Sequence, residues 1–286
     1  MMVILFMAVC SSNAQTAGDY YQQYEDAVKA EDYSKAFEAI KKCDDMCYHA
    51  PLSSFSLGMM YLMGKGTPVD TTQALISFSM ATSYTYRVNQ HLNWNKFGQD
   101  LGMSSSTIHG IEGDIKEMNR QYSLYMQLSP YLENVIMAFA YRWIACLYIE
   151  PVNTTTDLEE RLECASSAMD NAQKADSLCK DAYADYLLGK IHYEGLIGVK
   201  DYEKSAAYLE DAASRGSISA VTFLGEIYKD IDDKKGAKRM WKLAAETDIK
   251  PLILPTRTNI RYFLSSNIDI GDVREMKARA INYLKK

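Results

Sequence analysis

A short sequence pattern that occurs three times constrains the fold of this chain more than any other feature. The first copy spans residues 57–64 and the second spans residues 188–195. The third copy begins at Leu224 and keeps only the first part of the pattern. A pattern that recurs in this way predicts an array of similar structural units. The shared positions are Leu57, Gly58, Tyr61, Gly64, Leu188, Gly189, Gly195, Leu224, Gly225 and Tyr228.

Each copy predicts a pair of antiparallel helices. Leu and Tyr four positions apart lie on one face of a helix, and the glycine beside the Leu lets a neighbouring helix come close. Asp70 and Asp201 each follow a copy after a short loop, where a carboxylate can cap the next helix. Gln73 stands at the capping-box distance from Asp70. The small residues expected to let the second helix pack against the first include Ala206, Ala212, Ala213, Ala244 and Ala245.

The motif L-G-x-x-Y-x-x-G, the acidic residue after the loop and a closing A-A-x-x-G resemble Sel1-like repeats, which are related to tetratricopeptide repeats. The resemblance implies an all-α fold, a right-handed superhelical α/α solenoid of helical hairpins. The expected order is a signal peptide (1–16), an N-terminal tetratricopeptide-like hairpin (17–50), a Sel1-like repeat (51–83), a helical insertion (84–129), a degenerate repeat (130–180), two Sel1-like repeats (181–216 and 217–248) and a C-terminal capping helix (249–286).

Finer boundaries follow from capping residues. Asp32 is the expected cap of the second helix in the N-terminal hairpin. In the degenerate repeat we expect the turn at Pro151 and a following helix that opens on Thr156 and Glu159. The last helix is expected at Val273 to Leu284.

Residues 1–16 resemble a secretory signal. The apolar run from Met1 to Cys10 is shorter than the ~20 residues of a membrane-spanning helix. Cleavage after Ala14 would release a soluble chain, whereas lipobox processing would place a lipid on Cys10. Soluble release is favoured because Val9 is larger than a lipobox prefers. A packed apolar helix is the alternative. The sequence therefore predicts a periplasmic or secreted protein, attached to a membrane only if Cys10 is lipidated.

The charge of the chain limits which classes of ligand it can bind. There are 37 acidic residues against 31 Lys and Arg, which gives a net charge of −6, and no dense basic run. Binding to the phosphates of DNA or RNA needs clustered cations, so no nucleic-acid partner is expected. Hydrophobic residues make up 48% of the chain, enough for a buried core.

Few sequence motifs in this chain could form a metal site, a disulfide or a catalytic site. Cys43, Cys47 and His49 stand close together but lack a fourth ligand, so no metal or other cofactor is predicted. A disulfide between Cys43 and Cys47 is compatible with an oxidising compartment if the helix ends beside them. Ser177 to Lys180 has the Ser-x-x-Lys spacing of penicillin-recognising enzymes, without the other elements of their site. No catalytic residue is predicted.

Aromatic side chains are the main candidates for contact with a partner. The chain has 21 tyrosines, more than a repeat core requires. The candidate partner-binding residues are Tyr183, Tyr186 and Tyr202, together with Trp94 in the insertion. Such rings combine apolar area with a hydroxyl or N–H, which suits peptides, partner loops or sugars. The alternative is that most of them fill the seams between repeats.

The resulting expectation is an exported scaffold that binds a protein or peptide partner through the concave face of a repeat array. Two alternatives remain open. One is a cell-wall or β-lactam hydrolase, which the resemblance to cysteine-rich Sel1-like proteins implies. The other is a glycan-binding accessory protein.

Overall fold

The computed structural model describes residues 15–46, 50–83, 100, 102–110, 113, 130–265 and 267–285. Within these ranges the chain is helical, with one short 3-10 helix, an isolated bridge between Lys250 and Ile268, and no β-strand. The chain divides into two compact units, Met1–Ser129 and Pro130–Lys286. Residues 1–14 of the predicted signal segment, which include Cys10, lie outside the described residues, as do Cys47, Trp94 and most of the insertion.

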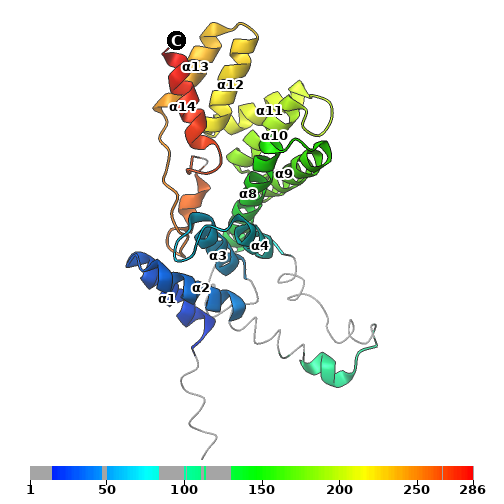
Figure 1. Ribbon diagram of the computed structural model, residues 1–286, viewed down its shortest axis with the longest axis vertical. Helices are drawn as coiled ribbons and strands as arrows, with labels where there is room; N and C mark the ends of the chain where they lie inside the picture. The colour runs from blue at the N-terminus through cyan, green and yellow to red at the C-terminus, as the bar shows by residue number, and fades with distance from the viewer. Residues whose placement is uncertain are drawn as a thin grey trace, which may run out of the picture. The chain divides into compact units, whose positions relative to one another are not determined.

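In residues 15–46 and 50–83, the first unit forms two helical hairpins. Helix α1 packs against α2, α2 against α3, and α3 against α4, so each helix contacts its neighbours in chain order (Figure 1). Thr16 and Asp19 form a reciprocal capping box at the start of α1. The core of the second hairpin includes the ring pair Phe55 and Phe78, with centroids 5.7 Å apart. The helices are α1 (Ala17–Lys29), α2 (Tyr33–Met46), α3 (Pro51–Met63) and α4 (Thr71–Ala81).

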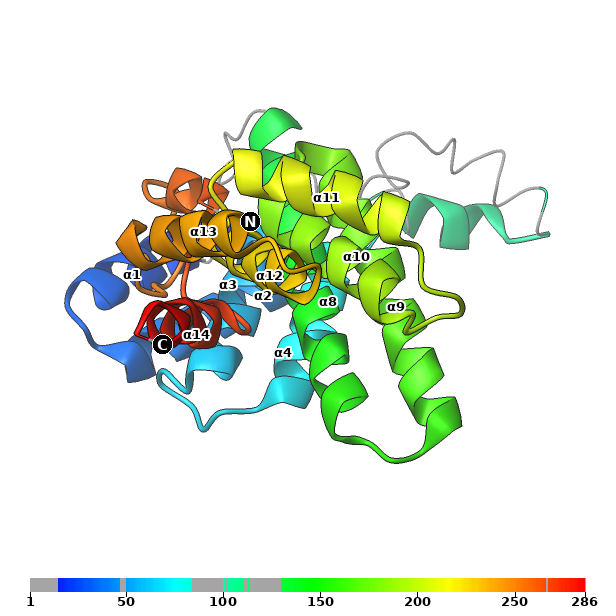
Figure 2. The same ribbon diagram turned by 90° about the horizontal axis from the view of Figure 1, so that it is seen from above.

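The second unit contains three hairpins and a closing helix. Each helix again packs against the next, and α14 lies against both α12 and α13 (Figures 1 and 2). Stacking of consecutive hairpins is the arrangement expected of an α/α repeat array. The elements are α8 (Pro130–Thr154), α9 (Leu158–Cys179), α10 (Ala182–Glu194), α11 (Tyr202–Ser214), α12 (Ile218–Asp230), α13 (Lys234–Glu246), the 3-10 helix η1 (Ile260–Leu264) and α14 (Val273–Leu284).

The glycine of the repeated pattern lies where two helices of a hairpin cross. A Cβ atom added at Gly58 would stand 2.6 Å from Phe78 Cε1, and one at Gly189 would stand 2.6 Å from Leu209 Cγ. At Gly225 the distance to Trp241 Nε1 would be 2.4 Å. Real Cβ contacts are not this short, so each hairpin needs a residue without a side chain at this position.

The loop and cap residues of the pattern end the first helix of each hairpin and start the second. Gly64 and Gly195 end α3 and α10 in the left-handed conformation, with φ of 63° and 67°. The Asp70 carboxylate accepts from the Gln73 amide at 2.9 Å. Asp201 accepts from the Lys204 amide at 3.0 Å, which confirms both predicted N-caps. Asp32 accepts from the Lys35 amide at 3.3 Å before α2.

Two expectations about the degenerate repeat were wrong. Helix α8 continues through Pro151 to Thr154, so the proline removes one amide donor from the last turn without ending the helix. Asp157, and not Thr156, caps α9, and its carboxylate accepts from the Glu160 amide at 3.0 Å. A carboxylate at this position also interacts favourably with the helix dipole.

Helix α8 is long and apolar enough over Leu132–Thr154 to cross a bilayer by length and composition. In the structure, 72% of its most apolar window is buried by protein, as in the core helix of a folded unit.

The small residues of the second helices do not all face the first helix. Ala212 and Ala244 are buried, and Ala213 and Ala245 are half-buried. Ala206 is exposed, so its predicted packing role was wrong. Its neighbour Ser205 is buried and faces Gly189 instead, since consecutive residues of a helix point in different directions.

Candidate functional site

Two of the predicted partner-binding tyrosines are part of the core. Tyr183 is 1% exposed and Tyr186 is 0% exposed, so neither offers a surface to a partner. Their hydroxyls donate to the two carboxylate oxygens of Asp272, at 3.0 Å and 2.5 Å. The prediction that these side chains bind a partner was wrong because they hold the start of α14 against α10.

The surroundings of Tyr183 and Tyr186 keep their hydroxyls protonated, so both act as hydrogen-bond donors. Burial, and then the negative charge of Asp272, raise the pKa of both phenols well above its ordinary value. Gly271, with φ of 50°, lies so close that an added Cβ would stand 2.1 Å from the Tyr183 hydroxyl oxygen. This contact leaves room only for glycine in the turn before α14.

Tyr202 is the predicted residue that reaches the surface. It is 58% exposed at the start of α11, and its ring meets Tyr193 edge to face at 5.4 Å. Tyr193 in turn packs edge to face on Phe223, at 5.3 Å. Val199, in the loop between α10 and α11, is 93% exposed. We call Tyr193, Val199 and Tyr202 the loop ridge.

The loop ridge is an apolar surface on a fixed support. Phe223 is buried in α12, so the ring series ends in the core of the second unit. Beside the ridge, the rings of His192 and Tyr208 stack with centroids 5.9 Å apart and planes 3° apart. Exposed apolar side chains held by packing from below suit the contact area of a partner.

Sequence reasoning missed Val199 and Tyr193 as members of this surface. In the sequence, Val199 stands in the short loop before Asp201, and Tyr193 occupies a variable position of the repeated pattern. Tyr193 lies in the last turn of α10 and Tyr202 starts α11, so how they lie relative to each other depends on the loop that joins the two helices. The pairing of loop ends in a helical hairpin is the signal that could have found them.

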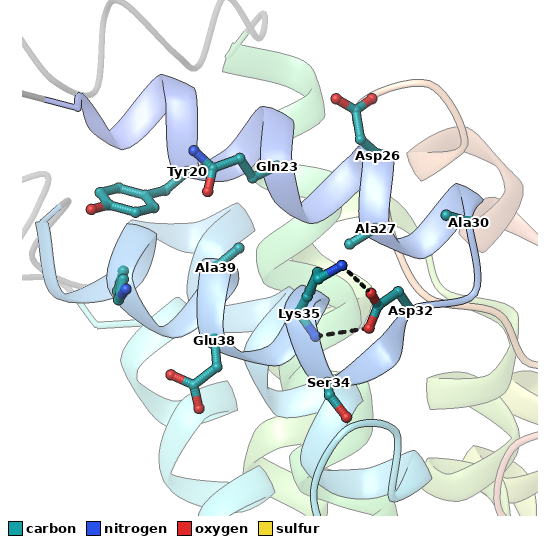
Figure 3. A pocket seen from close by; sticks show the side chains of 11 residues that line it. Tyr20, Gln23, Asp26, Ala27, Ala30, Asp32, Ser34, Lys35, Glu38 and Ala39 are labelled. Carbon is teal, nitrogen blue, oxygen red and sulfur yellow. Dashed lines mark hydrogen bonds and ion pairs between the residues drawn. The ribbon is translucent and has the colours of Figure 1, made fainter. Parts of the chain in front are cut away.

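The candidate binding surface of the first unit is a shallow groove between α1 and α2 (Figure 3). Its charges largely offset one another. Lys35 pairs with Asp32 at 2.8 Å, and the Lys42 ammonium lies 5.6 Å from the centre of the Tyr20 ring. Asp26 and Glu38 add acidic groups on the same rim. This groove shows no preference for one charge of ligand.

Ser177 and Lys180 of the Ser-x-x-Lys motif do not contact each other as a nucleophile and its base would. The Ser177 hydroxyl donates to the Lys174 carbonyl at 2.8 Å, while the Lys180 ammonium pairs with Asp176 at 3.0 Å. The Ser-x-x-Lys spacing therefore places no base on the serine. Cys43 is buried in α2 and Cys47 lies outside the described residues, so their disulfide stays a prediction.

No family model and no curated protein sequence matches this chain. Among solved structures, the chain is similar to a Sel1 repeat protein from Oxalobacter formigenes, with 19% identity over 81% of this chain and 88% of that chain and a TM-score of 0.37. It is also similar to a protective antigen of uropathogenic Escherichia coli strains that displays an SLR fold. There the identity is 16% over 94% of this chain and 60% of that chain, with a TM-score of 0.30.

These scores are too low to define the fold, which the hairpins themselves show. Glycines of the Leu-Gly motif lie at three helix crossings, and aspartates cap the second helices at Asp70 and Asp201. On that geometry, the chain is an all-α protein of stacked helical hairpins, and its repeated motif resembles that of Sel1-like repeats.

Proposed function

We propose that this chain is a non-enzymatic helical-repeat scaffold that binds a protein or peptide partner through the loop ridge. The observation that carries the proposal is the exposure of Tyr202, whose ring packs on Tyr193 and, through it, on Phe223, close in sequence to the exposed Val199. This surface lies at the loop end of the α10–α11 hairpin. It takes the place of Tyr183 and Tyr186 as the candidate contact.

Preorganisation favours binding at this surface. A tyrosine has few rotatable bonds, and Tyr202 is already held by its edge-to-face contact with Tyr193. Little side-chain entropy is therefore lost when a partner covers it. The hydroxyl supplies a hydrogen bond at the rim of an otherwise apolar contact.

The test is capture of a partner from an envelope extract with the intact chain as bait, followed by direct binding of the purified partner. We expect the double variant Tyr202→Ser/Val199→Ser to lose binding while it stays folded. The matched control is Leu243→Ser, which removes an apolar side chain, 47% exposed, from α13. Equal binding by both variants, or no captured partner with the unaltered chain, would overturn the proposal.

The two alternatives can be separated with the same proteins. A glycan array with the unaltered chain and the double variant tests the glycan-binding reading, since exposed tyrosine rings also stack on sugars. Labelling with a fluorescent penicillin tests the hydrolase reading. Neither probe is expected to react, and ridge-dependent glycan binding would replace the protein partner in this proposal.

Export is a separate proposal, supported by the apolar run and small residues of positions 1–16. Cell fractionation and sequencing of the mature N-terminus test it, and we expect a chain that begins after Ala14. The variant Cys10→Ser tests lipidation, because a lipid on that thiol would make membrane attachment depend on it. An intact N-terminus in the cytoplasm would contradict export.

A further inference from the structure

A pocket in the second unit lies at the opposite end of the α10–α11 hairpin from the loop ridge. Its volume is about 420 Å³, within the range of small-ligand sites. It is lined from α8, from the junction of α9 and α10, from the end of α11 and from the segment around η1. Its charged lining residues are Arg142, Lys180, Asp181, Arg215, Lys250 and Arg261.

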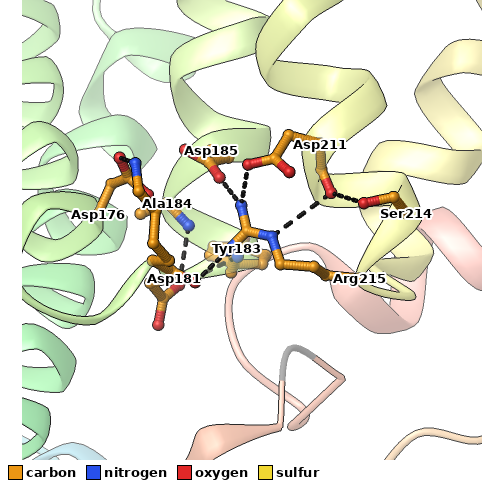
Figure 4. Close-up of polar contacts among 9 residues, drawn as sticks. Asp176, Asp181, Tyr183, Ala184, Asp185, Asp211, Ser214 and Arg215 are labelled. Atoms are coloured by element: carbon orange, nitrogen blue, oxygen red, sulfur yellow. Dashed lines mark hydrogen bonds and ion pairs between the residues drawn. The ribbon is translucent and has the colours of Figure 1, made fainter.

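Three of the five cations are neutralised by neighbouring carboxylates. Arg142 pairs with Asp181 at 2.8 Å, and Lys180 pairs with Asp176 at 3.0 Å. Figure 4 shows the Arg215 guanidinium between Asp185 and Asp211 and in contact with both. These pairs fix the wall of the pocket formed by the helix ends.

Lys250 and Arg261 differ from the other three. Both are exposed, and neither has a carboxylate partner in the part of the chain that the structure describes. The Lys250 ammonium lies 5.3 Å from the centre of the Tyr262 ring. Asp269, an acid of the same segment, is already paired with Arg274. The pocket therefore keeps uncompensated positive charge in a chain whose net charge is −6.

The segment that carries these two cations is held in place. The Lys250 amide donates to the Asn267 carbonyl at 2.8 Å, and the Asp269 amide donates to the Lys250 carbonyl at 2.9 Å. The Asn267 side chain joins the segment to the start of α12, where it accepts from the Ile218 amide at 2.9 Å. A ligand would thus meet a preformed site and not have to order a loop.

The uncharged lining combines the polar Ser265 and Asn267 with apolar side chains. Phe139 is 1% exposed, and its ring lies 4.7 Å from the Arg142 guanidinium. Leu264 is 46% exposed and offers an apolar side chain to a ligand in the pocket. Burial raises the pKa of the Cys179 thiol to about 12, so this side chain is neutral and adds to the apolar wall. A hydrated inorganic anion has no apolar part to pack against these side chains, whereas an organic anion does.

We propose that this pocket binds the carboxylate of an organic ligand, with Arg261 and Lys250 on the carboxylate oxygens and Leu264 against the carbon chain. Guanidinium and ammonium groups form charge-assisted hydrogen bonds to carboxylates. The carboxylate can come from a free small acid or from an acidic peptide.

This site is distinct from the loop ridge. Helices α10 and α11 each have 13 residues, which places their two ends about 20 Å apart. A small acid that binds the pocket therefore cannot touch Tyr202. The inference stands even if the loop ridge binds nothing.

The experiment is calorimetric titration of the full chain with three organic probes and one inorganic probe. Succinate represents a free acid, a blocked Glu-Glu-Leu peptide offers side-chain carboxylates, and an unblocked Gly-Leu peptide offers a terminal carboxylate. Inorganic phosphate tests for unselective anion binding. Binding of succinate alone would identify a free acid as the ligand. Binding of Glu-Glu-Leu would identify the side-chain carboxylates of an acidic peptide, and binding of Gly-Leu would identify a peptide's terminal carboxylate.

The test variant is Lys250→Gln/Arg261→Gln, which removes two exposed charges without disturbing the core. Its control is Lys204→Gln/Lys242→Gln, with the same net charge but cations 66% and 69% exposed elsewhere. We expect the dissociation constant for the bound carboxylate to rise about tenfold or more in the test variant and to stay unchanged in the control. The proposal is overturned if no carboxylate binds, if both variants weaken equally, or if phosphate binds as tightly as the organic probes.

Discussion

Arg142 and Asp181 form an ion pair that is closed to solvent, with 2.8 Å between Nη1 and Oδ2 and side-chain exposures of 1% and 4%. Asp181 also caps α10, where its other carboxylate oxygen accepts from the amides of Tyr183 and Ala184. One carboxylate therefore starts a repeat helix and neutralises a cation of the preceding helix pair. The repeat cap and the packing of α8 on α10 depend on the same residue.

Asp181→Asn is expected to destabilise the second unit by about 3–5 kcal/mol, because Arg142 is left buried without a counterion. Asparagine caps a helix as well as aspartate does, so the loss of the cap contributes little. Arg142→Met should cost less, since Asp181 keeps its two amide donors. Urea unfolding of both single variants and the double variant measures this. The double variant should be less destabilised than the sum, and additive costs would show that the pair is not coupled.

Gly189→Ala is expected to destabilise by about 1–3 kcal/mol, although alanine is the better helix former. The new Cβ would stand 2.6 Å from Leu209 Cγ and 3.3 Å from the Ser205 carbonyl oxygen, so α11 has to move. The control is Gly110→Ala, a helical glycine with no atom within 4 Å of the added Cβ. Thermal unfolding compares the two. An unchanged midpoint for Gly189→Ala would show that the crossing is not tight.

The repeated pattern predicted these crossings because each of its residues acts locally or against the partner helix of the same hairpin. Leu-Gly spacing, αL glycines and N-cap aspartates all depend on short stretches of chain, so Gly189 and Asp201 were predictable without coordinates. Tyr183 and Tyr186 were not. Their acceptor, Asp272, comes from the far end of the chain, and no local pattern reports a hydrogen bond over that separation.

The cationic pocket was unpredictable for the same reason. Arg142, Lys180, Lys250 and Arg261 are scattered over α8, a helix junction and the segment around η1. The sequence has no dense basic run, so its charge pattern, which excluded a nucleic-acid partner, gave no sign of this pocket. Only the folding of the C-terminal segment onto the helix ends brings these side chains together.

Asp272→Ala is expected to release the start of α14. The buried hydroxyls of Tyr183 and Tyr186 would lose their acceptor, and an unsatisfied buried group costs about 1–3 kcal/mol. Hydrogen exchange of the α14 amides should speed up more than that of α8 amides. Tyr186→Phe is the comparison, because it removes one donor and leaves Asp272 with the Tyr183 hydroxyl. Equal exchange of α14 in the Ala variant and the unaltered chain would contradict the anchoring role of Asp272.

His192 should make the stability of the second unit depend on pH. Burial, together with the positive charge of Lys204, holds the pKa of this imidazole below its ordinary value of 6.5, while Asp201 opposes the shift. Just below that ordinary value the unfolded chain binds more protons than the folded chain, so the free energy of unfolding decreases as the pH falls through this window.

His192→Tyr, which restores the aromatic residue of the repeated pattern, should remove this part of the pH dependence. It can still lie against Tyr208, which now stacks on the imidazole at 5.9 Å between ring centres. Urea midpoints at several pH values from 7.5 to 5 measure the difference between the two proteins. We expect their midpoints to diverge as the pH falls below about 6.5, with the unaltered chain losing more stability. Parallel curves would mean that His192 binds protons equally well in the folded and the unfolded chain.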